Sequence, residues 1–298
     1  MTAKAGITGS PAPTGAAAAE RTENMTGRSK CIRFLAAAIA ALLVFSCSGC
    51  GRAQTRTVSA DNSLRTVQTA GKLVLGLDAS FPPMGFTDED GEIVGFDIDV
   101  AQEVCLRLGV ELVKRPIAWD EKEVLLDSRG IDCIWNGLSV NAARAETMNL
   151  SDPYMKNDMV FVVNGSSTAK SMNDLKGRNI GVQRGSSAQE LLENWELYPD
   201  LTVSLLEDNV ALLNALSEDR LDAAFLDSVM AYYTIAFHDI ELYVLSGNLG
   251  EEEYAIGFRK EDETLRNKIQ EILYEMQADG CLGRISEKWF GSDITLLR

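Results

Sequence analysis

Residues 132–144 read DCIWNGLSVNAAR and combine three structural signals in one short stretch. The mostly apolar run IDCIW, residues 131–135, predicts a buried strand because it is short and is followed by turn-forming residues. A polar loop, NGLSVN, comes next. A short helix is expected to start near Ala142 and to carry Arg144. The stretch therefore predicts a strand, a loop and a helix that holds an arginine.

Alternating strands and helices continue on both sides of this stretch. KLVLGLD (72–78) predicts a buried strand that ends in an acid, and FDIDVAQEVCLRLG (96–109) predicts a helix with Gly109 as its stop. Further along, MVFVVN (159–164) and LDAAFLD (221–227) predict strands. Such repeated units indicate an α/β fold with mostly parallel sheets and helices on both faces.

Helix signals are also clear in the second half of the chain. Ser187 and Glu190 have the S-x-x-E spacing of a capping box, which predicts a helix that begins at Ser187. EYAIGFRKED (253–262) predicts a strand. The next segment places five apolar residues on one helical face: Leu265, Ile269, Ile272, Leu273 and Met276.

Composition and charge exclude several classes of function. The 298 residues include 44 acidic and 28 basic ones, a formal net charge of −16, so a nucleic-acid-binding face is not expected. The one histidine, His238, lies in a hydrophobic stretch and excludes a zinc site built on several histidines. No phosphate-loop or dinucleotide motif is present, and no CxxC pair occurs after Cys50. We therefore expect neither a metal nor a cofactor.

The N-terminal region has the pattern of an export signal. Three basic residues precede the apolar run FLAAAIAALLVF, residues 34–45, which is too short to span a bilayer comfortably. The sequence Cys47-Ser-Gly-Cys50 then resembles a bacterial lipobox with Cys50 as the lipidated residue, although Cys47 replaces the usual leucine. We expect residues 1–49 to be a signal peptide whose true start is Met25, and residues 50–63 to be a tether.

Three cysteines remain after that segment: Cys105, Cys133 and Cys281. Their odd number does not imply a full disulfide framework. Cys105 and Cys133 fall on apolar faces and are expected to be small buried side chains.

Seven motifs in order carry a resemblance to a known family. They are LDASFPPMGF, GEIVGFDIDVA, DCIWNGLSVNAAR, LSDPYM, LKGRNIGVQRGSSA, LDAAFLDS and ISEKWFG. From about Leu73 to Gly291 the chain resembles extracellular solute-binding proteins of polar amino acid ABC importers, with the two-lobed type II periplasmic-binding fold. The resemblance implies two hinge crossings, near 158–163 and 247–253. Lobe 1 would comprise 64–157 and 254–298, and lobe 2 would comprise 158–253.

The resemblance also implies a binding site for an amino acid. A zwitterion needs a cation for its carboxylate and an anion for its ammonium. Arg144 matches the arginine that grips the α-carboxylate, for which a planar, permanently charged fork is suited. Gly137 and Ser139 match positions that offer backbone groups and a hydroxyl, and Ser187 matches one whose amide meets the same carboxylate. Asp227 matches the acid that binds the α-ammonium.

Other positions would surround the rest of the ligand. The resemblance makes Phe81 and Trp119 aromatic walls and places Asp78 near the side chain or the ammonium of the ligand. Gln183 is expected to touch the side chain, and Asn136 is a further candidate.

The implied protein is a monomeric, lipid-anchored receptor that is not an enzyme and that delivers a polar amino acid to ABC permease subunits. A cyclohexadienyl or arogenate dehydratase-like enzyme on the same fold is one alternative. An amino acid sensor and a surface adhesin are others. The sequence leaves open whether cystine, glutamine, arginine or glutamate is bound.

Overall fold

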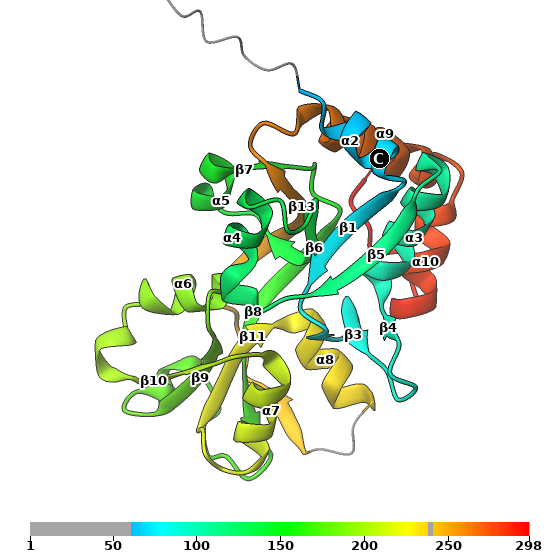
Figure 1. Ribbon diagram of the computed structural model, residues 1–298. Coiled ribbons are helices and arrows are strands. Elements are labelled where there is room, and N and C mark those ends of the chain that lie inside the picture. The colour runs from blue at the N-terminus through cyan, green and yellow to red at the C-terminus, as the bar shows by residue number, and fades with distance from the viewer. Residues whose placement is uncertain (1–60, 238–240, 298) are drawn as a thin grey trace, which may run out of the picture. The chain divides into compact units, whose positions relative to one another are not determined.

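A mixed β-sheet forms the centre of the computed structural model, which describes residues 61–237 and 241–297, within one compact part of the chain. Its main path runs β10-β9-β11-β8-β13-β6-β1-β5, and β12 and β7 pair with β8 and β13 (Figure 1). A second sheet of three short strands has the order β2-β3-β4.

The strands of the main sheet are β1 (Lys72–Leu77), β5 (Glu111–Pro116), β6 (Cys133–Ser139), β7 (Met148–Leu150), β8 (Met155–Asn164), β9 (Asn179–Gln183), β10 (Thr202–Leu206), β11 (Ala223–Asp227), β12 (Leu242–Val244) and β13 (Gly250–Arg259). The small sheet contains β2 (Ser80–Phe81), β3 (Gly85–Thr87) and β4 (Ile93–Val94).

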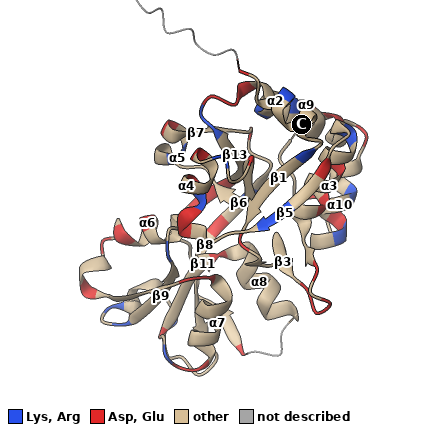
Figure 2. Ribbon diagram, in the orientation of Figure 1, with Lys and Arg blue, Asp and Glu red and all other residues tan. Residues whose placement is uncertain are grey.

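The helices are α2 (Ser63–Ala70), α3 (Phe96–Leu108), α4 (Lys122–Asp127), α5 (Ala142–Thr147), α6 (Ser187–Glu193), α7 (Asn209–Ser217), α8 (Ser228–Phe237), α9 (Glu263–Ala278) and α10 (Cys281–Phe290). Three 3₁₀ turns are η1 (Trp119–Glu121), η2 (Met172–Leu175) and η3 (Tyr198–Asp200). Acidic residues are spread along helices such as α3, α4 and α6 (Figure 2).

Strand direction divides the main sheet into two parallel parts and an antiparallel centre. β5, β1 and β6 pair in parallel, as do β10, β9 and β11. Between them, β8 and β13 are antiparallel to each other and to their other neighbours in the main path. The predicted crossings, 158–163 and 247–253, fall in and just before this central pair. The lobe boundaries stay a prediction.

The predicted helix faces are buried as expected. α3 ends at Gly109, whose φ of 71° is left-handed, and its side chains Ile98, Val104 and Cys105 lie in the largest apolar cluster. The five apolar residues predicted for the later helix are all buried in α9. Cys105 and Cys133 are buried and free, which confirms the expectation of small buried side chains.

Some predictions concern residues outside the described ranges. These are the signal peptide, the start at Met25, the lipidation of Cys50 and most of the tether, and His238 lies outside the described ranges too. Within 61–237 and 241–297, no helix has both the length and the apolar character needed to cross a membrane.

Candidate functional site

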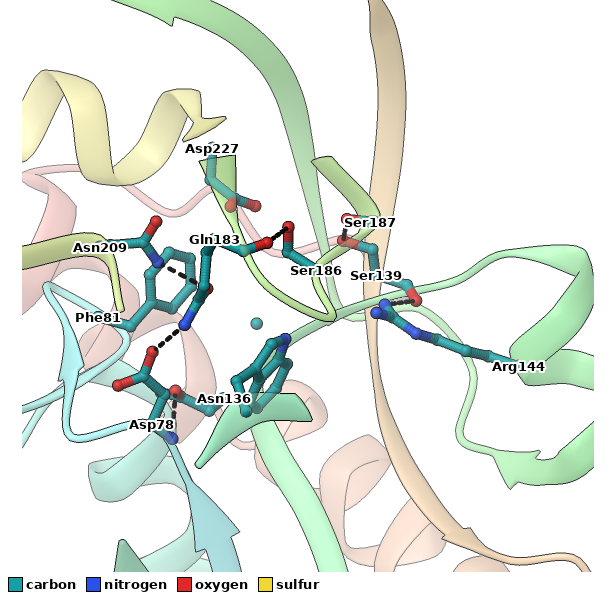
Figure 3. A pocket seen from close by; sticks show the side chains of 12 residues that line it. Asp78, Phe81, Asn136, Ser139, Arg144, Gln183, Ser186, Ser187, Asn209 and Asp227 are labelled. Atoms are coloured by element: carbon teal, nitrogen blue, oxygen red, sulfur yellow. Dashed lines mark hydrogen bonds between the residues drawn. The ribbon is translucent and has the colours of Figure 1, made fainter. Parts of the chain in front are cut away.

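A pocket forms where the carboxyl ends of four strands meet. Asp78 directly follows β1, while Ser139, Gln183 and Asp227 are the last residues of β6, β9 and β11. Open α/β sheets bind ligands at such strand ends. The space between atoms is about 300 Å³, part of it open to solvent. It is lined by Asp78, Phe81, Trp119, Asn136, Gly137, Ser139, Arg144, Gln183, Ser186, Ser187, Asn209 and Asp227 (Figure 3).

All ten residues predicted for a ligand site are therefore brought to one pocket. Sequence reasoning missed two of its lining residues, Ser186 and Asn209. Ser186 could have been found as the neighbour of Ser187 in a run of small polar residues. Asn209 carries no comparable motif, since it lies just inside α7 and its direction depends on how that helix packs.

Arg144 gives the pocket a buried positive charge. Its side chain is only 4% exposed, and Nη1 donates a hydrogen bond to the Ser139 carbonyl oxygen at 2.7 Å. The other terminal nitrogen, Nη2, is buried and has no hydrogen-bond partner in the structure. Burial lowers the pKa of this guanidinium. Because a buried donor without an acceptor is costly, this nitrogen is suited to receive an anionic ligand group.

Two hydroxyl groups lie beside the arginine. Ser187 Oγ is 3.1 Å from Ser139 Oγ, and both residues are buried. The predicted capping box is wrong by one residue. Ser186 is the N-cap of α6, since its hydroxyl accepts a hydrogen bond from the Gln189 amide, and Ser187 is the first helical residue. The Ser187 hydroxyl is therefore not used as the cap and is directed to the pocket.

Asp227 supplies a carboxylate to the same pocket. Its Oδ1 accepts hydrogen bonds from the Tyr254 hydroxyl at 2.6 Å and from the Asn157 amide at 2.8 Å. Desolvation, followed by the nearby negative charge of Glu252, raises the pKa of Asp227 to about 7. A cation next to this carboxyl would favour its ionised form and so be attracted to it.

Asp78 is held in a chain of amide hydrogen bonds. Gln183 Nε2 donates to Asp78 Oδ2 at 2.6 Å, and Asn209 Nδ2 donates to Gln183 Oε1 at 3.0 Å (Figure 3). Ser80 donates to the other carboxylate oxygen of Asp78 through its backbone amide. Burial raises the pKa of Asp78, and these hydrogen bonds oppose that rise. The chain fixes the polar groups at this end of the pocket.

Asn136 and Gly137 shape the pocket through the backbone. Asn136 Oδ1 accepts a hydrogen bond from the Asp78 amide at 3.1 Å. Gly137 has φ of +58°, and a Cβ there would lie 2.6 Å from the ring of Phe81. Its amide donates to Asp97 Oδ2 at 2.7 Å, so only its carbonyl group could serve a ligand.

Trp119 is fixed by a buried lysine that the sequence analysis did not single out. Lys122 Nζ lies 5.1 Å from the centre of the Trp119 ring and donates to the Trp119 carbonyl at 3.1 Å. It also donates to the Gly185 carbonyl at 2.8 Å. Burial and the charge of Arg144 lower the pKa of Lys122. This lysine therefore links the Trp119 turn to the loop that leads into α6.

No group of three or more His, Cys, Asp or Glu residues placed to hold a metal ion occurs in the part of the chain that the structure describes.

Fold and pocket together define a small-solute-binding protein of the type II periplasmic-binding class. The chain matches the family described as bacterial extracellular solute-binding proteins, family 3, over residues 73–292, and it belongs to that family.

Similar proteins bind different amino acids. L-cystine-binding protein TcyJ of Escherichia coli (strain K12) is 31% identical over 234 residues, which cover 78% of this chain and 87% of that protein. The structure of Tv2483 bound to L-arginine has a TM-score of 0.77 and 32% identity, over 80% of this chain and 98% of that one. An ABC uptake transporter substrate binding protein from Streptococcus pneumoniae with bound histidine has a TM-score of 0.75 and 35% identity, over 80% and 99% of the two chains.

One similar structure bears on the enzyme alternative. The ancestral amino acid-binding protein AncCDT-1, a precursor of cyclohexadienyl dehydratase, has a TM-score of 0.71 and 28% identity, over 76% of this chain and 99% of that one. AncCDT-1 is itself described as a binding protein, as are TcyJ and the Streptococcus pneumoniae protein.

Proposed function

We propose that this protein is an extracytoplasmic receptor that binds one polar α-amino acid in the pocket and delivers it to the permease of an ABC importer. Family membership supports this proposal, as do the amino acids bound by the similar proteins. The observation that carries it is the pair of opposite charges in one pocket. Arg144 has a buried nitrogen without a partner, and Asp227 lines the same pocket with a desolvated carboxyl group.

Each part of an α-amino acid has a matching group in this proposal. Arg144, with the hydroxyls of Ser139 and Ser187, receives the carboxylate, and Asp227 receives the ammonium. Phe81 and Trp119 cover the apolar part of the ligand. The linked side chains of Asp78, Gln183 and Asn209 face the side chain of the ligand.

Titration calorimetry with single variants tests these assignments. Arg144→Ala and Asp227→Ala should each lose about 2–5 kcal/mol of binding free energy, because a buried ligand charge is left without its partner. That loss corresponds to binding weaker by about 30-fold to several thousand-fold.

Arg184→Ala is the matched control, since Arg184 lies next to the pocket loop but its side chain is 53% exposed. It should bind within a few-fold of the unmodified protein. A folded Arg144→Ala or Asp227→Ala protein with unchanged affinity would contradict the proposal.

A thermal-shift screen identifies the ligand and tests the dehydratase-like alternative. The twenty amino acids and cystine are compared with a prephenate-like compound. A ligand at 100 times its dissociation constant adds about 2.7 kcal/mol of stability. Stabilisation by the prephenate-like compound alone would favour the enzyme.

Membrane anchoring through a lipid on Cys50 is the remaining part of the proposal, supported by the basic residues, apolar run and Cys47–Cys50 sequence. A Cys50→Ala protein expressed in a bacterium should no longer incorporate labelled fatty acid and should appear in the soluble fraction. Unchanged membrane association of this variant would count against lipidation.

A further inference from the structure

Glu252 is an acidic residue beside the pocket that neither the sequence motifs nor the proposed ligand contacts include. It lies on β13, opposite Asn157 of β8, between two other glutamates. Glu251 and Glu253 are exposed, whereas Glu252 is partly buried. Successive side chains of a strand point to opposite faces, so Glu252 alone of the three turns toward the pocket.

The Glu252 carboxylate engages both serines proposed to bind the ligand carboxylate. Its Oε2 accepts a hydrogen bond from Ser139 Oγ at 2.5 Å and one from Ser187 Oγ at 3.0 Å. A hydroxyl group has one proton to donate. Ser139 donates its proton to Glu252, and Ser187 shares its one proton between Glu252 Oε2 and Ser139 Oγ. In this arrangement neither serine has a proton free to donate to a ligand.

Arg144 lies close to Glu252 and is also the residue proposed to bind the ligand carboxylate. Burial raises the pKa of Glu252, and the hydrogen bonds from the two serines and the positive charge of Arg144 oppose that rise. Arg144 Nη1 is fixed on the carbonyl oxygen of Ser139, the residue whose hydroxyl Glu252 holds. A ligand carboxylate at the unpartnered Nη2 of Arg144 would therefore lie near the Glu252 carboxylate, which already accepts hydrogen bonds from the hydroxyls of both serines.

We propose that Glu252 competes with the carboxylate of the ligand for the hydroxyl groups of Ser139 and Ser187. The Glu252 carboxylate must release these two hydroxyls before the ligand can use them. This inference rests on the proposed function. By holding donors that the ligand needs, Glu252 sets the affinity of the receptor below the value that the remaining contacts would give.

The structure provides a space into which the displaced carboxylate can turn. Glu252 also lines a neighbouring cavity of about 520 Å³ that is open to solvent. Lys156 and Asn157 line that cavity too, as do three further acidic residues, Asp158, Glu251 and Glu253. A rotation of the Glu252 side chain would thus exchange two hydroxyl donors for water.

Calorimetry with Glu252→Gln and Glu252→Ala tests the proposal. Glu252→Gln keeps the shape of the side chain and removes its charge, and both variants should bind the amino acid more tightly, by about tenfold for Glu252→Ala. Glu253→Gln removes the same charge from the exposed neighbour and should change the affinity by less than about twofold. Unchanged or weaker binding in both folded Glu252 variants would overturn the proposal, weaker binding indicating that Glu252 contacts the ligand.

A double-mutant comparison separates competition for the hydroxyls from a general effect of charge. In a Ser139→Ala, Ser187→Ala background, Glu252 has no hydroxyl to withhold, so Glu252→Ala should no longer increase the affinity. An equal increase in both backgrounds would contradict the mechanism. Failure of the unmodified protein to bind any amino acid would instead contradict the proposed function, and the two failures are thereby distinguished.

Discussion

Asp227 is the residue whose protonation should control binding most directly. Its pKa is raised to about 7 by burial and by the charge of Glu252. An ammonium group favours the ionised carboxylate, so protons and ligand compete for Asp227. The ionised fraction falls from about nine-tenths at pH 8 to about one-tenth at pH 6, and affinity should fall about tenfold over that range.

Calorimetry at several pH values measures this dependence. Binding near pH 7 should also release protons, which makes the apparent enthalpy depend on the buffer. In Asp227→Asn the fall in affinity toward low pH should be lost, whatever its absolute affinity. A slope that persists in this variant would assign the titration to another group, such as Asp78 or Glu252.

Some residues of the site could be predicted from the sequence, and others could not. Motif order placed Arg144 and Asp227 at the pocket because each directly follows a recognisable strand or loop. Glu252 was missed because it is the middle of three consecutive glutamates. Strand alternation shows that it differs from its neighbours, but only the register with β6, in which Tyr254 is opposite Ser139, shows that Glu252 is on the face of Ser139.

Among the elements, the end of strand β6 depends on a glycine for its geometry. Gly137 combines a left-handed φ of +58° with a position where a Cβ would lie 2.6 Å from the Phe81 ring. Gly137→Ala should therefore cost about 1–2 kcal/mol for the backbone and about 1–3 kcal/mol more for the clash. Denaturant unfolding followed by fluorescence measures the loss.

Gly91→Ala is the matched control for this variant. Gly91 also has a positive φ, +82°, but nothing lies within 4 Å of a Cβ built there. Its substitution should cost only the backbone contribution. If the two variants lose the same stability, the contact between Gly137 and Phe81 does not shape the pocket as described.

The beginning of α6 shows the limit of sequence prediction for elements. Two adjacent serines precede the helix, and Ser187 has the glutamate spacing of a capping box. The structure uses Ser186 instead, because Gly185 with φ of +70° turns the chain there and the Ser186 hydroxyl also donates to the Gln183 carbonyl. The S-x-x-E spacing located the helix but could not distinguish between the two adjacent serines as its N-cap.

For the whole molecule, strand order and direction were the least predictable features. The alternation of strands and helices predicted the two parallel parts of the sheet, since parallel strands need helical crossovers. It did not predict that β8 and β13, each of ten residues, run antiparallel between them. An apolar strand has the same residue pattern in either direction, and the partner of β8 lies about ninety residues further along the chain.

Several contacts cross between the two predicted lobes and would change if the lobes moved. Gln183 donates to Asp78, Lys122 donates to the Gly185 carbonyl, and Asn141 donates to Glu190 at 2.8 Å. A ligand held by Arg144 on one side and Asp227 on the other adds to these contacts only when the lobes are together. It should therefore shift the population toward the closed form.

Small-angle X-ray scattering tests this expected closure. Saturating amino acid should decrease the radius of gyration of the unmodified protein, because closing two lobes brings their mass together. Arg144→Ala, at the same ligand concentration, should keep the larger radius since it cannot hold the ligand carboxylate. Because Lys122 donates to the Gly185 carbonyl across the two predicted lobes, Lys122→Met should enlarge the radius measured without ligand if the lobes move as rigid bodies. Equal radii in all of these samples, with binding confirmed by calorimetry, would mean that the pocket takes its ligand without movement of the lobes.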